Sequence, residues 1–170
     1  MMCGITGTPG TGKSMVAEEL RRRGHTVVHI VDTVRDYVTG LDEERNTQMI
    51  DTERWAAGFT RVHGFVEGHF AHLLACDRIV VLRCRPDELS LRLQQRKYNQ
   101  EKIAENTEAE ALDSCLIETV ERFDPSQILE LDTTGKDAAF CAGQIEQFYL
   151  GSIPPSFGSI DWSGYLGVMR

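Results

Sequence analysis

The sequence lacks the long apolar runs that helical membrane proteins need. No run approaches the roughly 18 apolar residues of a transmembrane helix. The first seven residues also lack the basic start and the long apolar stretch of a secretory signal peptide. We therefore expect a cytoplasmic protein that makes no use of a membrane.

The sequence has no cluster of cysteines, because its five cysteines are widely scattered. No two cysteines are close enough to form the CxxC pair that is typical of zinc or redox sites. Free cysteine usually behaves as a small apolar residue, so we expect reduced thiols that are mostly buried. The five positions are Cys3, Cys76, Cys84, Cys115 and Cys141.

Positive charge is also in short supply. The chain has 18 lysines and arginines against 26 aspartates and glutamates, which gives a net charge of −8. Proteins that bind nucleic-acid backbones need a surplus of basic residues, so we expect no direct binding of nucleic acid. An acidic surface favours a basic protein partner instead. An anionic nucleotide would need a local cluster of positive charge.

What is present is an alternation of apolar strands with amphipathic helices over 170 residues, a length that fits one domain. Such alternation predicts a parallel sheet covered by helices on both faces. The expected strands are residues 1–5, 26–30, 64–67, 78–82 and 127–131, with a short extended piece at 48–51. The expected helices are residues 13–23, 32–38, 53–62, 69–75, 86–96, 101–122 and 136–150. We expect a loop at 40–46 and an irregular tail at 151–170, which packs on the domain or on a partner.

A glycine-rich loop follows the first expected strand. Residues 7–14 read Gly-Thr-Pro-Gly-Thr-Gly-Lys-Ser, which fits the P-loop pattern completely, and an amphipathic helix follows. Backbone N–H groups of such a loop surround phosphate oxygens. Lys13 is expected to reach the β- and γ-phosphates, and the Ser14 hydroxyl to bind Mg²⁺. The motif predicts that the protein binds ATP with Mg²⁺.

An acidic residue at the end of a neighbouring strand would complete a metal site. Glu67 closes the expected strand 64–67, and His69 follows two residues later. Ligands of parallel sheets bind beyond the carboxyl ends of the strands, which favours a functional role for both. Asp32, just past another strand, is a rival candidate. A helix cap or an ordinary surface position is the alternative interpretation for Glu67 and His69.

Arginines could supply the charge that phosphoryl transfer needs. Arg35 follows the second expected strand. Arg92 and Arg96 are four residues apart, and so share one helix face, just before an apparent break at residues 97–99. A hinged segment carrying both arginines could close over the phosphates. The alternative is a plain charged helix face.

With these motifs, residues 1–150 resemble the adenylate kinase isoenzyme 6 family, small nucleotide kinases also described as maturation factors of the small ribosomal subunit. The archaeal members are the most similar. The resemblance rests on the P-loop, on Asp-Thr-Val-Arg at 32–35 and on Val-Glu-Gly-His at 66–69. Its most specific part is residues 92–106, which run from Arg92 through Arg-Lys-Tyr-Asn to Lys-Ile-Ala-Glu-Asn, followed by Glu-Ala-Glu at 108–110.

The resemblance implies a P-loop nucleoside monophosphate kinase-like α/β fold, a three-layer parallel sheet with two insertions. Residues 29–52 would form the monophosphate-binding region, with Arg35 on the AMP phosphate, and residues 95–105 the lid. Lys136 would lie near adenine. The candidate catalytic residues are Lys13, Arg35, Glu67, His69, Arg92 and Arg96. The candidate nucleotide-binding residues are Gly10, Thr11, Gly12, Lys13, Ser14, Met15, Arg96 and Lys136, and the candidate metal ligands are Ser14 and Glu67.

One position departs from the family pattern. The family usually has aspartate where this chain has Glu67, whose extra methylene could turn direct metal contact into contact through water. The expected lid also lacks the four cysteines of zinc-bearing adenylate kinases, so we expect no zinc.

Three functions follow from these expectations. The first is an adenylate kinase that converts ATP and AMP into two ADP, with some intrinsic ATPase activity. The second is an ATPase switch in ribosome maturation that acts on a basic protein of the small subunit, with His69 orienting water. The third is a kinase for another small substrate, such as a different nucleotide or a metabolite like shikimate.

Overall fold

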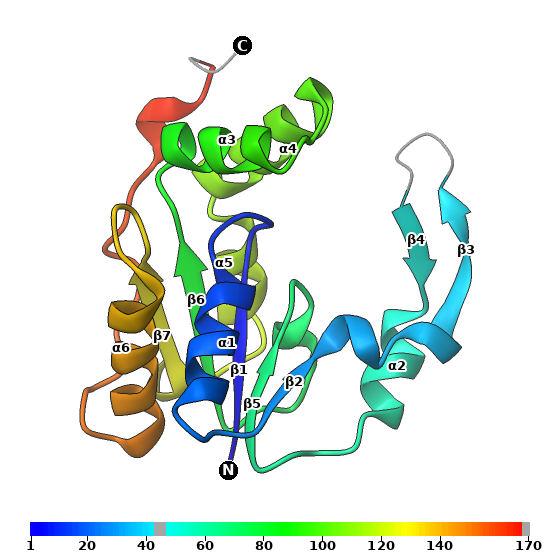
Figure 1. Cartoon of the computed structure of the whole chain (residues 1–170), viewed down its shortest axis with the longest axis vertical. Coiled ribbons are helices and arrows are strands. Elements are labelled where there is room, and N and C mark those ends of the chain that lie inside the picture. Colours follow the sequence, from blue (N-terminus) through cyan, green and yellow to red (C-terminus); the bar gives the residue numbers. More distant parts are fainter. Residues whose placement is uncertain (43–46, 168–170) are drawn as a thin grey trace.

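The computed structural model describes residues 1–42 and 47–167. Its centre is a sheet of five parallel strands in the order β2-β5-β1-β6-β7 (Figure 1). The five strands expected from the apolar pattern are confirmed, with shifts of one or two residues at most ends. They are β1 (Met2–Gly7), β2 (Val27–His29), β5 (Gly64–Glu67), β6 (Arg78–Arg83) and β7 (Ile128–Asp132).

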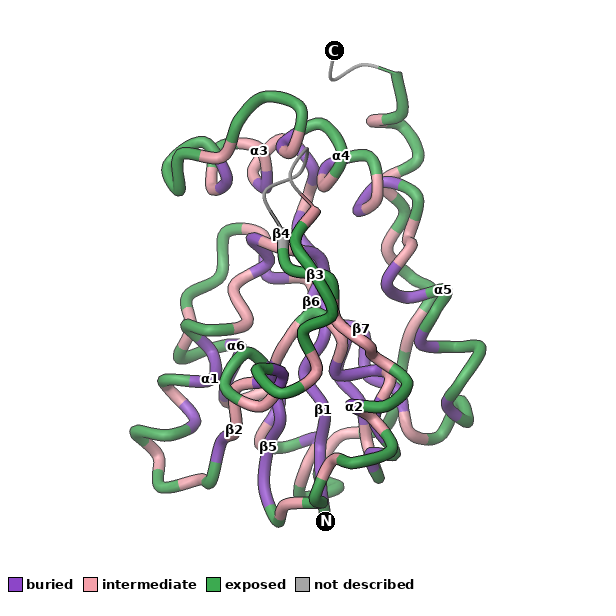
Figure 2. Tube along the Cα trace, turned by 90° about the vertical axis from the view of Figure 1, so that its right-hand side faces the viewer, coloured by how far each residue is buried: buried purple, intermediate pink, exposed green. Residues whose placement is uncertain are grey.

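Helices cover both faces of this sheet, as the alternating pattern predicts. On one face, α1 (Lys13–Arg22) and α6 (Ala138–Leu150) pack their apolar side chains against β1, β5 and β6. On the other face, α2 (Thr52–Gly58), a short 3₁₀ helix (Ala71–Leu73) and α5 (Ser114–Val120) pack around the buried Trp55 and Leu116. Figure 2 shows the strands of the sheet as the most continuously buried part of the chain. The three-layer α/β fold is therefore the one expected.

Two further helices lie beyond the carboxyl ends of the strands (Figure 1). Helix α3 (Pro86–Gln95) begins with proline at its first position, as expected, and α4 (Gln100–Ala111) follows after a break. The single long helix expected at 101–122 is wrong. Asp113 adopts a left-handed conformation with φ of 56°, which ends α4, and α5 begins at Ser114. The Asp113 carboxylate is held there by Arg83.

The segment between β2 and β5 is less helical than expected. The helix expected at 32–38 is wrong, because two 3₁₀ helices (Ile30–Asp32 and Arg35–Tyr37) occupy this region. Part of the expected loop at 40–46 is a strand, since β3 (Val38–Asp42) pairs antiparallel with β4 (Thr47–Ile50), and positions 43–46 lie outside the described residues. The helix expected at 53–62 stops at Gly58, where a side chain would meet the Tyr37 hydroxyl. At 69–75, only the 3₁₀ turn of residues 71–73 forms.

Two residues of the tail, Ser156 and Gly158, contact β7, while packing of the tail on a partner stays a prediction. Ser156 forms a parallel bridge with Leu129, with backbone hydrogen bonds to Ile128 and Glu130 of 3.1 and 2.8 Å. The Gly158 N–H donates to the Glu130 carboxylate at 2.7 Å. The tail therefore covers the outer edge of β7.

No helix in residues 1–42 and 47–167 is long and apolar enough to cross a bilayer. All five cysteines are free and buried, as the scattered spacing predicts. Burial raises the pKa of the Cys76 and Cys84 thiols to about 12 and the pKa of Cys3 further still. These thiols are therefore protonated and unreactive at neutral pH.

Candidate active site

The glycine-rich loop runs from the end of β1 to the start of α1. Gly10 and Gly12 have φ values of 96° and 103°, a left-handed conformation that glycine adopts without a steric penalty. Gly12 is also the residue that precedes α1 and offers no side chain to cap it. The first N–H groups of α1 are thus left for an anion, which the positive end of the helix dipole also attracts.

The loop is packed closely against α3. A Cβ on Gly10 would come within 2.7 Å of Leu89 and 3.0 Å of Leu93, both fully buried side chains of α3. Any larger residue at position 10 would therefore press on these two leucine side chains. The same contact places α3 and its continuation directly beside the loop.

Lys13 lies inside this loop. Its ammonium group donates hydrogen bonds to the carbonyl oxygens of Gly7 at 2.7 Å and of Thr8 at 3.0 Å. Desolvation lowers its pKa to about 8, against the opposing effect of neighbours that include Glu67 and Glu110. A phosphate group entering the loop would restore favourable charge around this ammonium group.

Two cavities open on opposite sides of the loop. The first, which we call the α6-side cavity, has a volume of about 420 Å³. Its lining comes from the loop, from the end of α3 and from the residues that lead into α6. These residues include Thr11, Met15, Arg92, Thr133 and Lys136.

The second, which we call the β2-side cavity, has a volume of about 450 Å³. Its apolar walls come from the segment after β2, from β4 and from Phe70. Its polar lining includes Lys13, Ser14, Gln48, Glu67 and His69. Gly10, Gly12 and Arg96 line both cavities, so the two spaces meet at the loop and at the end of α3.

Glu67 is held in place by a neighbouring strand. The parallel register sets His29 of β2 opposite Glu67 of β5, and His29 Nδ1 contacts Glu67 Oε1. Glu67 is 5% exposed, yet it lines the β2-side cavity together with Ser14. Carboxylate and hydroxyl oxygens are ligands that Mg²⁺ accepts, so this pair fits a magnesium ion.

His69 lies at the rim of the same cavity. Its Nδ1 is 3.2 Å from the Gly7 carbonyl oxygen, which can only accept a hydrogen bond, so Nδ1 carries the proton. Desolvation and the charge of Lys13 lower the pKa of His69, so the ring is neutral at pH 7. Its Nε2 is then an acceptor.

Arg92 is tied to the protein rather than free to move. It donates to the Thr133 hydroxyl at 3.2 Å and to the Thr133 carbonyl at 3.0 Å, and it pairs with Glu88. Arg96 follows the last residue of α3 and lines both cavities. Lys136 is exposed, and its ammonium group lies 5.3 Å from the centre of the Phe140 ring.

Arg35 is the one candidate catalytic residue that the structure does not bring to the cavities. It is exposed on a 3₁₀ helix, although its neighbour Val34 lines the β2-side cavity. Asp32, the rival metal ligand, is likewise exposed and lines neither cavity. The remaining candidates surround the loop: Gly10, Thr11, Gly12, Lys13, Ser14, Met15, Glu67, His69, Arg92, Arg96 and Lys136.

Sequence reasoning missed three residues that shape the site. His29 holds Glu67. Thr133 donates to the Thr11 carbonyl at 2.9 Å and so ties the loop to the end of β7. Glu110 accepts from the Thr8 hydroxyl. His29 and Thr133 are polar residues at the carboxyl ends of strands, a signal that could have found them.

Comparisons with known proteins find relatives of this chain. A family model described as "AAA domain" matches residues 3–113. A protein of Archaeoglobus fulgidus named "Putative adenylate kinase" is 46% identical over 134 residues, which cover 79% of this chain and 74% of the relative. A protein of the same name from Methanothermobacter thermautotrophicus is 39% identical over 173 residues, covering 98% and 99% of the two chains.

Solved structures with the same fold are much more distant in sequence. An uncharacterized protein from Eubacterium ventriosum has a TM-score of 0.56 at 13% identity, covering 90% of this chain and 99% of its own. Thymidylate kinase from Candida albicans has a TM-score of 0.51 at 12% identity, covering 89% and 91%. Similarity at this level establishes the fold only.

The matched span includes the P-loop, β5 with Glu67, and the helices α3 and α4, so it contains most of the site. The relatives match over most of their own lengths. The chain therefore belongs to the AAA-domain family of P-loop proteins, in the group that contains these archaeal adenylate kinase-like relatives.

Proposed function

We propose that this protein is a nucleoside monophosphate kinase that transfers the γ-phosphate of ATP to AMP and forms two ADP. The observation that carries the proposal is the pair of cavities that share Gly10, Gly12 and Arg96. Two substrates can occupy such spaces with their phosphates meeting at the loop. A single nucleotide site would need one cavity.

The relatives support the proposal through their names. The archaeal proteins at 39% and 46% identity are both named "Putative adenylate kinase". The choice of AMP as acceptor rests on the names and on the sequence resemblance.

In the proposed reaction, ATP occupies the α6-side cavity and AMP the β2-side cavity. Lys13 and the loop N–H groups hold the β- and γ-phosphates, and Arg96 lies where both substrates can reach it. When bound, magnesium neutralises charge on the phosphates, and Ser14 and Glu67 would hold it. The AMP phosphate is already a nucleophile, so no strong general base is required.

Two segments would move around the substrates. Residues 29–52, with the β3–β4 hairpin, would close over the monophosphate, and the segment at 95–105 would close over ATP. Such closure excludes water from the transferring phosphate. Arg35 is exposed in the present form, so its proposed contact with the AMP phosphate requires movement of the first segment.

A panel of acceptors tests the proposal directly. AMP, GMP, CMP, UMP and dTMP are each supplied with Mg-ATP, and the nucleotides formed are separated by chromatography. AMP should be phosphorylated fastest. If ATP is consumed no faster with AMP than without any added acceptor, the proposal is wrong. A small acceptor such as shikimate would then be tested next.

The variant Lys13→Ala supplies the control for contaminating kinases. In the proposed reaction the Lys13 ammonium group holds the phosphates, so its removal should lower turnover by about 100-fold or more. The thermal unfolding midpoint should change little. Turnover close to that of the wild type would show that the site has been misplaced.

A second candidate is ATP hydrolysis at the same site, as a switch that acts on a basic protein partner. The neutral His69 favours it, because Nε2 is an acceptor at the rim of the β2-side cavity and could orient water. The partner, expected to be a basic ribosomal protein, stays a prediction. Hydrolysis that persists without AMP, and that falls in His69→Ala, would support this activity. Binding of a basic ribosomal protein in ATP but not ADP would support the switch.

A further inference from the structure

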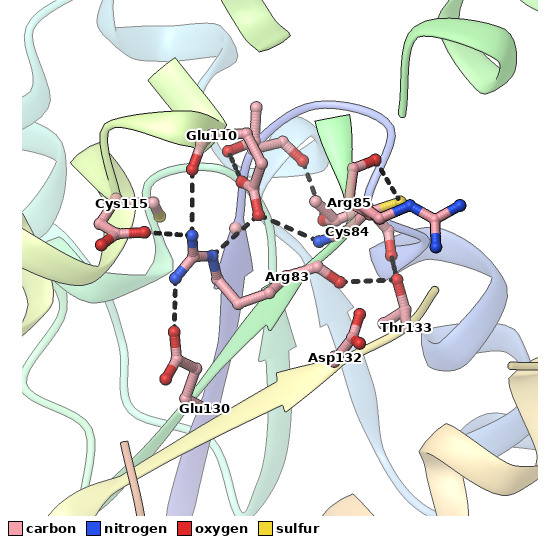
Figure 3. Close-up of polar contacts among 12 residues, drawn as sticks. Arg83, Cys84, Arg85, Glu110, Cys115, Glu130, Asp132 and Thr133 are labelled. Carbon is pink, nitrogen blue, oxygen red and sulfur yellow. Dashed lines mark hydrogen bonds and ion pairs between the residues drawn. The ribbon is translucent and has the colours of Figure 1, made fainter. Parts of the chain in front are cut away.

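The buried arginine Arg83 organises a group of carboxylates behind the P-loop (Figure 3). Arg83 is 1% exposed and lies at the end of β6. It pairs with Glu110 of α4 at 2.8 Å, with Glu130 of β7, and with Asp113 between α4 and α5. A buried charge needs several partners, and here they come from three separate parts of the fold.

Glu110 differs from the other partners because it also contacts the phosphate loop. Its Oε2 accepts a hydrogen bond from the Thr8 hydroxyl. Its Oε1 accepts from Arg83 Nε at 2.8 Å and from the Cys84 N–H at 3.0 Å. The Glu110 carboxylate thus joins α4, the end of β6 and the second residue of the loop.

Thr8 in turn sets the conformation of the catalytic end of the loop. Its carbonyl oxygen accepts from Lys13 Nζ at 3.0 Å and from the Thr11 hydroxyl at 2.9 Å. A shift of Thr8 would therefore move the groups that hold Lys13. The only atom of the Thr8 side chain that can hydrogen-bond is the one that Glu110 holds.

We propose that Glu110 is a positioning residue for phosphoryl transfer, which fixes Thr8, and through it Lys13, relative to α4. This rests on the proposed kinase function. Glu110 itself lines neither cavity. It acts by making the loop and the base of the α3–α4 segment one rigid unit, because α3 already packs on Gly10. The rigid loop is then ready for the phosphates without rearrangement.

The test compares two carboxylates that share Arg83. Glu110→Gln keeps the shape of the side chain but removes its charge, and Thr8→Val removes the hydroxyl at the other end of the contact. Glu130→Gln is the matched control, because Glu130 is also buried against Arg83 but bonds to the tail at Gly158 instead of the loop. The kcat, the KM for each substrate, the Kd for Mg-ATP and the unfolding midpoint are measured for each.

Glu110→Gln and Thr8→Val should each lower kcat by about 10-fold or more, as expected for a displaced catalytic group. The double variant should be no slower than the worse single variant, because both changes act on the same contact. Thr8→Ser should retain more activity than Thr8→Val. Glu130→Gln should lower the unfolding midpoint but leave kcat and the Kd for Mg-ATP within about twofold of the wild type.

Additive losses in the double variant, or equal effects of Glu110→Gln and Glu130→Gln, would overturn the proposal and leave Glu110 as a stabilising residue. If Glu110→Gln does not fold, Thr8→Val and Thr8→Ser still test the contact. If the wild type phosphorylates no monophosphate, the kinase proposal fails, but the Kd for Mg-ATP in the same variants still reports on the loop. An unchanged Kd in that case also refutes the role of Glu110.

Discussion

Among single residues, His29 has a role that depends on its partner in the neighbouring strand. It holds the Glu67 carboxylate across the β2–β5 pair, where Glu67 faces the β2-side cavity. Residues that hold a metal ligand typically contribute 10- to 100-fold in metal affinity. We expect His29→Gln to raise the Mg²⁺ concentration needed for half-maximal activity by about 10-fold or more.

The matched control is His25→Gln. His25 has a similar side-chain exposure, 22% against 20% for His29, and also pairs with a glutamate, but at Glu146, away from the cavities. It should leave the Mg²⁺ dependence unchanged. If His29→Gln alters the unfolding midpoint but not the Mg²⁺ dependence, then Glu67 does not bind metal, or does not need His29 to do so.

What the sequence could predict about these residues depended on local signals. Lys13 and Ser14 follow from a contiguous motif, and Glu67 follows from its place at the end of a strand. His29 could not be paired with Glu67 in advance, because the pairing depends on the β2–β5 register. Glu110 stands within the expected long helix, and only the fold brings it to Thr8.

At the scale of elements, the junction between α3 and α4 has a strained residue. Lys97 has a φ of 61°, and the N–H groups of Lys97 and Tyr98 bond back to the carbonyls of Gln94 and Leu93 at 2.9 and 3.2 Å. This is the Schellman arrangement, which favours glycine at that position. We expect Lys97→Gly to raise the free energy of unfolding by about 1 kcal/mol, or roughly 2–4 °C in the unfolding midpoint.

The control is Gln94→Gly, an exposed position inside α3. Glycine there should lower the free energy of unfolding by about 1 kcal/mol. Both variants are compared by urea unfolding. Destabilisation of similar size in both would mean that the left-handed conformation at position 97 is not the one adopted in solution.

A second element-scale prediction concerns the contact between α1 and α6. Glu146 of α6 accepts from His25 at 2.6 Å and from Arg23 at 3.2 Å, and the bond from His25 is the main cause that lowers its pKa. A carboxylate with a lowered pKa in the folded state stabilises at neutral pH, and this contribution is lost as the pH falls through that pKa. We expect Glu146→Gln to cost on the order of 1 kcal/mol at pH 7.

Urea titrations at pH 7, 5 and 3.5 measure the free energy of unfolding of both proteins. The deficit of Glu146→Gln relative to the wild type should shrink as the pH falls below 4.5, the ordinary pKa of the carboxyl group. Glu18→Gln is the control, because Glu18 pairs with Arg21 on the open surface of α1, with its side chain 72% exposed. It should have no measurable effect. A Glu146→Gln deficit that persists undiminished at pH 3.5 would point to packing rather than charge.

The same scale shows where sequence patterns fail. Each buried strand was expected close to its observed place, because a continuous apolar run is a local signal. The helix at 101–122 was expected unbroken, since Leu112 and Asp113 do not resemble a helix stop. The break comes from the tertiary pairing of Asp113 with Arg83. Likewise, the β3–β4 hairpin depends on pairing between two short segments of mixed polarity.

At the scale of the whole molecule, the arrangement of the two cavities was beyond sequence reasoning. Arg96 was expected to contact ATP, whereas in the structure it lines both spaces. The chain has a net charge of −8, yet four basic residues line the cavities, namely Lys13, Arg92, Arg96 and Lys136. These residues supply the positive charge that an anionic ligand needs. A ligand that spans both cavities would therefore report on the whole arrangement.

Such a ligand is two adenosines joined by a chain of five phosphates. Because it fills both cavities without a second binding event, it should bind more tightly than ATP. At about 100 times its Kd it should stabilise the folded protein by roughly 2.7 kcal/mol. At equal concentration, its shift of the unfolding midpoint should exceed that of ATP. Arg96→Ala should reduce this advantage, while Arg22→Ala, on the open surface of α1, should not. Equal protection by the two ligands would mean that the β2-side cavity holds no nucleotide.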